Sequence, residues 1–522
     1  MNRFKKFIFN GLLLTAVSLI MRTVSVSFNV YISNTVGAEA MGLFTLISTV
    51  YGFAITFATS GVNLASTRLV SEALGKLHSN DNEARIEKTP QVRKAIRKCI
   101  FYCLFFGSLA SFVLFICAPG ISISLLKDKR CISSLRALSL TLTPISVSSA
   151  LNGYFTAVRK AYKNAFAQVF EQMVKIFSCS LLLSRFFAND VESACLCIVA
   201  GSVIAELFSF VMHAVMYLLE KSDRCRIKQS KVAEGEGLLK IALPVAFSAY
   251  LRSGLITVEH ILIPWGLERS GAARDISLAA YGTIHSMVFP VVFFPSAILS
   301  SFAGLIVPEL SQANAEKKYN DINRIVLNVF ETSLIFSIGA AGIMIFFSYE
   351  LGKVIYPASD AGVYIKMIAP LIPIMYLDTS VDAMLKGLGE QVYSMGVNIV
   401  DSMLSVILVI ILLPKFGITG YIMTVYFTET VNATLSITRL LQVSKIKPLV
   451  ISRVIKPLAA VILSSLCVKH LNPFSIIPFA SSAAELLINI CLTVALYLLF
   501  VMIFGALKPS KIKKAVKLLQ FN

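Results

Sequence analysis

Long apolar runs recur along almost the whole chain, and they constrain the fold more than any other feature of the sequence. A run of about 18 or more apolar residues is long enough to cross a bilayer as a helix. The chain has 522 residues and a hydrophobic content of 56%, which exceeds the roughly 45 to 50% typical of soluble domains. The sequence therefore predicts an all-α integral membrane protein.

Fourteen of these runs are predicted to be transmembrane helices. They cover residues 7–33, 41–67, 99–119, 133–157, 165–186, 192–219, 239–266, 278–307, 325–348, 362–385, 391–413, 418–438, 454–469 and 483–506. The first run is longer than the apolar region of a signal peptide, so we interpret it as a retained span.

Basic residues fall mainly in alternate loops, and this asymmetry predicts the orientation. With the N-terminus in the cytoplasm, the outward loops hold only nine of the 48 lysines and arginines: Lys127, Lys129, Arg130, Arg185, Arg269, Arg274, Lys353, Lys415 and Lys469. Because an even number of helices returns the chain to its starting side, the C-terminus is also expected in the cytoplasm. Loops facing anionic lipid account for the net charge of +19, so no nucleic-acid partner is expected.

The sequence contains an internal repeat. A shift of 230 residues places Arg22 on Arg252. A shift of 240 residues places Gly42 on Gly282. Six helices return the chain to the same side of the membrane, so the two halves are predicted to be parallel repeats. The predicted organisation is a six-helix lobe (7–219), a basic cytoplasmic linker (220–238), a second six-helix lobe (239–440), two further helices (453–506) and a basic cytoplasmic tail (507–522).

Polar side chains form a stripe on each of three predicted helices. Positions three or four apart share one helix face. The stripes comprise Ser18, Arg22, Ser25, Asn29 and Ser33 in the first helix, Ser248, Arg252 and Glu259 in the seventh, and Asp378, Asp382 and Lys386 in the tenth. A guanidinium at the bilayer centre costs roughly 2.5 to 3.5 kcal/mol on insertion scales, so these faces are expected to line a cavity.

Each stripe also has a structural interpretation. Arg252 and Glu259 are two turns apart and can pair if both side chains extend. Asp382 and Lys386 have the i, i+4 spacing of a simple ion pair on a helix. The sequence alone leaves these interpretations open beside the functional ones.

No enzymatic, metal or cofactor site is expected. The five histidines lack zinc-motif spacing, and the ten cysteines form no paired CxxC clusters. No Walker A loop, G-x-G-x-x-G fingerprint or catalytic-triad signature occurs, so ATP-driven transport by this chain is not expected.

The stretch NTVGAEAMGLFTLISTVYGFAITFATSGVNLASTRLVSEALGK resembles the first two helices of the stage V sporulation protein B family. This family lies within the multidrug/oligosaccharidyl-lipid/polysaccharide exporter superfamily, which also holds lipid II and O-antigen-type flippases. The resemblance implies fourteen helices in two six-helix lobes. It also implies a monomer in the plasma membrane that moves polyprenyl-diphosphate-linked saccharides, such as cell-wall, spore-cortex or exopolysaccharide precursors, to the outer leaflet by alternating access.

The resemblance and the stripes together suggest roles for individual residues. Arg22 and Arg252 are expected to hold the diphosphate, because guanidinium groups donate two parallel hydrogen bonds to phosphate oxygens. The substrate-binding set is completed by polar groups expected to bond sugar hydroxyls: Asn29, Ser18, Ser25 and Ser248. The carboxylates expected to act in coupling or gating are Glu259, Asp378 and Asp382. Asn29 and Asn34 stand where relatives often carry arginines, which argues against lipid II itself as the substrate.

Three other functions remain open. A cation-coupled multidrug exporter of the same superfamily would use carboxylates at the cavity centre, and Glu259 and Asp378 suit that role. A non-transporting scaffold would hold wall-synthesis proteins as partners and would tolerate loss of the cavity charges. A membrane-embedded glycosyltransferase or polymerase would need larger outward loops than the roughly dozen residues expected here.

Overall fold

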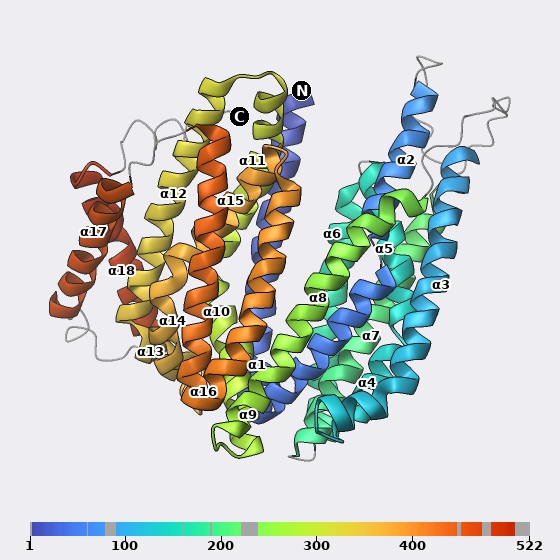
Figure 1. Ribbon diagram of the computed structural model, residues 1–522, viewed down its shortest axis with the longest axis horizontal. Helices are drawn as coiled ribbons and strands as arrows, with labels where there is room; N and C mark the ends of the chain where they lie inside the picture. The colour runs from blue at the N-terminus through green and yellow to red at the C-terminus, as the bar shows by residue number, and fades with distance from the viewer. Residues whose placement is uncertain are drawn as a thin grey trace. The chain divides into compact units, whose positions relative to one another are not determined.

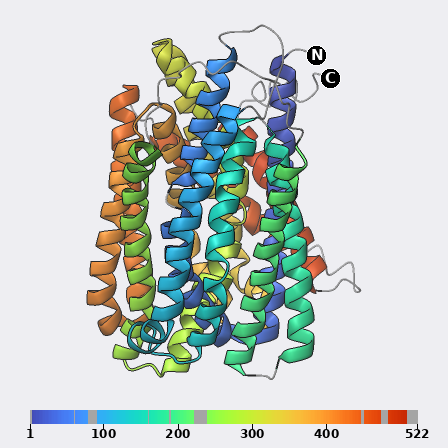
Figure 2. The same cartoon turned by 90° about the vertical axis from the view of Figure 1, so that its right-hand side faces the viewer.

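The computed structural model describes residues 3–59, 61–78, 90–158, 160–187, 190–220, 238–445, 450–471 and 482–506. Within these residues every regular element is a helix (Figures 1 and 2). The predicted all-α fold is therefore confirmed. Most of the predicted linker (220–238) and all of the tail (507–522) lie outside the described residues.

The chain divides into two compact units. Unit 1 comprises Met1–Phe28 and Glu39–Gly282, and unit 2 comprises Asn29–Ala38 and Thr283–Asn522. The predicted lobes follow sequence repetition rather than contacts, so their boundaries remain a prediction. The contact division differs from them in placing residues 239–282 with unit 1 and residues 29–38 with unit 2.

Unit 1 is built mainly from the helices of the first half of the chain. The elements that begin in this unit are α1 (Arg3–Thr59), α2 (Val62–His78), α3 (Pro90–Gly120), the π-helix η1 (Ile121–Leu125), α4 (Cys131–Ser139), α5 (Leu142–Ala157), α6 (Ala161–Phe186), α7 (Val191–Leu218), α8 (Leu238–Arg269) and α9 (Arg274–Gly282). Helix α5 packs against α2, α3 and α7, and α6 packs along α7.

Unit 2 is built from one long helix and several shorter ones. Its elements are the π-helix η2 (Thr283–Val288), α10 (Phe289–Phe293), α11 (Ser296–Ala315), α12 (Tyr319–Phe346), α13 (Ser348–Ile355), α14 (Ala361–Ile368), the 3-10 helix η3 (Ala369–Leu371), α15 (Ile372–Gly387), α16 (Gln391–Ser444), α17 (Val450–Leu471) and α18 (Ser482–Ile503). Helix α15 packs on α11, α12 and α16, while α17 contacts both α12 and α18.

Two of these helices are bent at glycines. Helix α1 is interrupted at Gly37, whose φ of 84° and ψ of 172° suit only glycine. Helix α16 is interrupted at Gly417, with a φ of 56°. Each bend separates two predicted spans, and nine helical stretches of the described residues are long and apolar enough to cross a membrane. The total of fourteen spans remains a prediction.

Helix α3 shows why these helices need lipid. Phe101, Phe105 and Phe112 share one face and are 75, 60 and 65% exposed. Cys99 and Cys103 lie on the opposite face, inside the core of unit 1. A helix that is apolar on its outer face as well as its inner one is stable only where that outer face meets hydrocarbon.

Three loops predicted to lie on the outward side meet at one end of unit 1. Arg130 pairs with Glu39 at 3.0 Å, so the segment after η1 contacts the start of the second half of α1. Arg274 of α9 donates a hydrogen bond to the carbonyl oxygen of Leu126. The three segments therefore share an end, as the predicted topology requires, although the side of the membrane remains a prediction.

The glycines that the repeat aligns are in contact. A Cβ added to Gly42 would lie 3.2 Å from the backbone nitrogen of Gly282 and would overlap the Leu278 carbonyl group. The small residues let α1 and α9 approach at backbone distance.

Candidate functional site

Helix α8 carries the clearest candidate site. Its packing face contacts the second half of α1: the Tyr250 hydroxyl lies 3.4 Å from the Phe57 carbonyl oxygen. On the same face, Thr56 donates a hydrogen bond to Ser253 at 3.3 Å. At about 100° per residue, the stripe Ser248, Arg252 and Glu259 lies on the opposite side of the helix. The residues that fix α8 against α1 thus turn this stripe away from α1.

Arg252 is exposed and lies midway along α8. It makes no ion pair, hydrogen bond or ring contact with any described residue. Ser248 and Glu259, on the same face, are half-buried. The alternative interpretation, an ion pair between Arg252 and Glu259, is therefore not what the structure shows.

The first half of α1 carries the equivalent stripe. Arg22 is half-buried and Ser25 is exposed, and both belong to unit 1. Ser18 also lies in α1, but its side chain is outside the described residues. Arg22 makes an interaction of its own, so it differs from Arg252, which makes none with the described residues.

Asn29 continues this stripe into unit 2. Its side-chain amide donates a hydrogen bond to the carbonyl oxygen of Ser286, in the π-helix η2. This contact joins residues 257 positions apart and occupies the amide nitrogen. The Asn29 side chain therefore positions η2 in this structure as well as lying on the polar stripe.

The three polar residues of α15 fall into two groups. Asp382 accepts hydrogen bonds from Lys386, at 2.6 Å, and from the hydroxyl of Ser394. The structural interpretation of this i, i+4 pair is the one observed. Asp378 lies one turn earlier and is half-buried.

His260 follows Glu259 in sequence but lies on the packing face of α8. Its Nδ1 is 2.6 Å from the Tyr281 hydroxyl and 3.5 Å from the Thr49 hydroxyl. These contacts link α8 to α9 and to α1. His260 is thus a packing residue of unit 1, separated from the Arg252 stripe by its position around the helix.

An apolar cavity of about 570 Å³ lies within unit 2. Its walls come from α12, η3, α15, α16 and α17, and Thr430 and Thr434 are the only polar side chains among the residues that line it. The volume is that of a typical ligand pocket. Apolar residues lining a cavity have the same sequence pattern as core residues, so only the fold reveals it.

The described residues contain no cluster of three or more histidine, cysteine or acidic side chains that could hold a metal ion. The nine cysteines described, from Cys99 to Cys491, are all free thiols.

Sequence and structure comparisons place the chain among membrane transporters by fold. The family model "Polysaccharide biosynthesis protein" matches residues 8–269, and the MatE model matches residues 271–411. Stage V sporulation protein B of Bacillus subtilis (strain 168) is 25% identical over 521 residues, with 97% of each chain covered.

Two solved structures share the architecture. The lipid II flippase MurJ in an inward closed conformation aligns with a TM-score of 0.63 at 16% identity, covering 94% of this chain and 98% of MurJ. An inward-facing MATE multidrug transporter of the MOP superfamily aligns with a TM-score of 0.60 at 13% identity, covering 83% of this chain and 100% of that one. The chain belongs to the polysaccharide biosynthesis protein family, and its fold is that of the MOP-superfamily transporters.

Proposed function

We propose that this protein is a flippase that moves polyprenyl-diphosphate-linked saccharides across the plasma membrane by alternating access. The observation that carries the proposal is Arg252, an exposed arginine midway along a membrane helix with no partner among the described residues. An uncompensated guanidinium at that depth costs roughly 2.5 to 3.5 kcal/mol. A diphosphate ligand repays this cost with charge-assisted hydrogen bonds.

The diphosphate is held by Arg22 and Arg252. Ser18, Ser25, Asn29 and Ser248 offer hydrogen bonds to the saccharide. Asn29 can accept such bonds through its amide oxygen and donate one through its second N–H, because the Ser286 carbonyl takes only one N–H.

The apolar cavity of unit 2 supports a lipid substrate. Its lining is almost wholly aliphatic, with Phe346 as the single aromatic residue. A branched prenyl chain buried there gains about 25 cal/mol for each Å² of apolar surface removed from water or headgroups. The apolar cavity therefore fits the prenyl chain of the substrate, and the arginines fit its diphosphate.

The carboxylates have a secondary role in this proposal. Glu259 shares a helix face with Arg252, and ion or proton binding there changes how strongly Arg252 holds an anion. Asp378 is the corresponding candidate in unit 2. Asp382 already accepts a hydrogen bond from Lys386. It can therefore bind a coupling cation only if that cation displaces Lys386.

The test is substrate binding by the purified full chain. Arg252→Ala is expected to weaken the binding of an undecaprenyl-diphosphate saccharide by at least about tenfold, the effect of one charge-assisted hydrogen bond. Arg185→Ala is the matched control, because Arg185 is another exposed arginine without a partner among the described residues but lies at the end of α6. Equal affinities for the wild type and Arg252→Ala would contradict the proposal.

A cation-coupled multidrug exporter is the second candidate. The MatE match over residues 271–411 and the intramembrane carboxylates Glu259 and Asp378 favour it. An exporter of this kind would bind a cationic drug in the same experiment, and Glu259→Gln would weaken that binding. A non-transporting scaffold for wall-synthesis proteins would bind neither ligand.

A further inference from the structure

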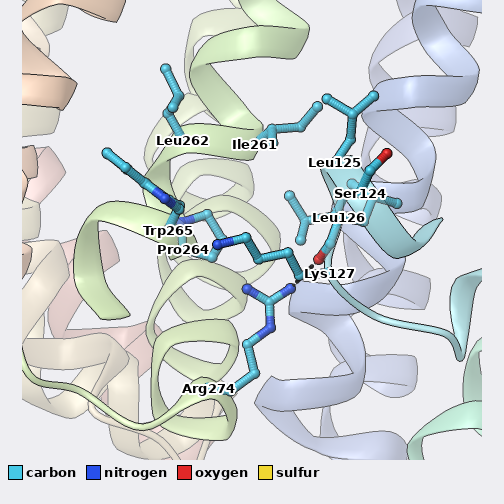
Figure 3. Close-up of a pocket in the computed structure, with 10 residues that line it drawn as sticks. Ser124, Leu125, Leu126, Lys127, Ile261, Leu262, Pro264, Trp265 and Arg274 are labelled. Atoms are coloured by element: carbon cyan, nitrogen blue, oxygen red, sulfur yellow. Dashed lines mark hydrogen bonds between the residues drawn. The ribbon is translucent and has the colours of Figure 1, made fainter. Parts of the chain in front are cut away.

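A second, smaller pocket lies in unit 1, at the end where η1, α8 and α9 meet (Figure 3). It has a volume of about 180 Å³. Lys127 lines it from the segment after η1, while Trp265 and Arg274 line it from the end of α8 and the start of α9. In Figure 3 the Lys127 side chain extends toward Pro264 and Trp265 and the Arg274 guanidinium lies below it, with aliphatic residues of η1 and α8 nearby. Arg252 lies about three and a half turns earlier on α8 than Trp265, while Glu259 of the same stripe lies less than two turns before it.

The position of Arg274 is fixed by two partners. It pairs with Glu268 and donates to the Leu126 carbonyl oxygen, the contact drawn as a dashed line in Figure 3. Its Nε is buried and has no acceptor among the described residues. One donor of this guanidinium therefore remains available while the group itself is held in place.

Lys127 supplies a charge with no counterion. It is exposed and makes no ion pair or hydrogen bond with any described residue. Its φ of 53° places it in the left-handed region, which non-glycine residues adopt at a cost. The neighbouring acids Asp128 and Glu39 are both bonded to Arg130 rather than to Lys127.

The local charge is positive. Arg269 stacks on Trp265, with its guanidinium carbon 4.4 Å from the ring centroid. Lys127, Arg269 and Arg274 contribute three positive charges, while Glu268 removes one and the group of Asp128, Glu39 and Arg130 removes another, which leaves about one. The pocket therefore favours an anionic ligand.

We propose that this pocket binds the diphosphate of the lipid-linked saccharide on the side of the membrane where it is released. The inference rests on the proposed function and on the predicted topology, in which these loops face outward. Lys127 and Arg274 bind the phosphate oxygens, and Trp265 and the aliphatic lining contact the first part of the prenyl chain. The pocket holds the head after it has left the arginine stripes and before it departs.

Trp265 provides a direct test, because it is the only tryptophan in the chain. Its fluorescence is measured on the purified full chain during titration with farnesyl diphosphate, with farnesol as the uncharged control. A saturable change is expected with the diphosphate only. Lys127→Asn is expected to weaken this response by about tenfold or more, since asparagine tolerates the left-handed backbone and removes the charge. Lys129→Asn, an exposed neighbour outside the pocket, is the control and is expected to change the affinity by less than about twofold.

Two further arms separate this site from the proposed cavity and from general lipid binding. The same titration in an Arg22→Ala, Arg252→Ala background is expected to keep the Trp265 response, even though that protein should not transport. Loss of the response there would show that the signal arises from the other site and would overturn the proposal. An equal response to phosphatidylglycerol, or an unchanged response in Lys127→Asn, would also overturn it.

Discussion

Charged side chains in unit 1 differ in whether the protein itself balances them. Glu220 lies just beyond α7, with a side chain 6% exposed, and it receives hydrogen bonds from Lys160 at 3.0 Å, Lys163 at 2.8 Å and Tyr154 at 2.5 Å. Arg252 has no such partner among the described residues. Glu220 therefore stabilises the fold, whereas we propose that Arg252 binds a ligand.

The Glu220 cluster makes unit 1 sensitive to acid. Burial opposes ionisation, but the hydrogen bonds from Lys163, Tyr154 and Lys160 outweigh it and lower the pKa of Glu220 below its usual value. A group whose pKa is lowered by folding stabilises the protein above its unfolded pKa and loses that effect as the pH falls through the folded pKa. Acidification below about pH 4 is therefore expected to destabilise the wild type more than Glu220→Gln.

Thermal unfolding in detergent at several pH values checks this prediction. At pH 7, Glu220→Gln is expected to lower the free energy of unfolding by about 1 to 3 kcal/mol, because hydrogen bonds to an ionised group are lost. Glu316→Gln is the control, since Glu316 forms an exposed pair with Lys318 and should matter little. Parallel pH profiles for the wild type and Glu220→Gln would refute the argument.

Sequence reasoning at this scale succeeded where local periodicity was sufficient. The spacing of Ser248, Arg252 and Glu259 predicts one helix face, and the structure places all three on the face opposite to the α1 contacts. The spacing of Asp382 and Lys386 left two interpretations open, and the ion pair is the observed one. The Asn29 contact with Ser286 depends on the fold, so no local pattern could reveal it.

At the scale of elements, the bend in α1 depends on Gly37. Its φ of 84° and ψ of 172° are accessible essentially to glycine alone. Gly37→Ala is therefore expected to lower the free energy of unfolding by about 1 to 3 kcal/mol. Gly52→Ala, in the regular part of the same helix with open space around it, is expected to raise it by about 0.5 to 1 kcal/mol. Equal effects of the two substitutions, measured by thermal unfolding, would show that the bend is not specified by Gly37.

The cavity of unit 2 predicts how prenyl length affects binding. Thr434 lines it from α16 and is exposed, so Thr434→Phe is expected to fill part of the space without unfolding the helix. Affinity for a long-chain lipid diphosphate should fall by about tenfold, because the phenylalanine ring takes up space that the prenyl chain would fill. A tenfold change corresponds to the loss of about two buried methylene groups. Affinity for a short-chain analogue should stay unchanged.

Thr438→Phe is the matched control for this experiment. Thr438 lies one turn further along α16, is also exposed, and makes the same hydrogen bond to the carbonyl oxygen four residues earlier. It does not line the cavity. If both variants lost affinity for the long-chain lipid, or if neither did, the result would contradict binding of the prenyl chain in this cavity.

Helix positions could be predicted from apolar runs, but the breaks within them could not. The single predicted span 278–307 contains the end of α9, then η2, α10 and the start of α11. Pro290 lies in the first turn of α10 and Pro295 caps α11. Hydropathy averages over such breaks because the flanking residues stay apolar, so it cannot locate them.

At the scale of the whole molecule, hydropathy established the class because a bilayer demands both apolar side chains and internally bonded backbone. The pocket between η1, α8 and α9 was beyond sequence reasoning, since it brings Lys127 together with Trp265 of α8 and Arg274 of α9, more than 130 residues later. The division into two compact units also depends on contacts that sequence repetition does not contain.

The central claim is that the arginines of the two polar stripes carry a lipid diphosphate across the membrane. Flipping of a fluorescent undecaprenyl-diphosphate saccharide in proteoliposomes tests it most directly, with the wild type compared against the Arg22→Ala, Arg252→Ala variant and Arg185→Ala as the control. We expect the wild type and the control to flip the lipid at similar rates and the double variant to lose activity while still inserting and folding. Flipping by the double variant at the wild-type rate would contradict the claim.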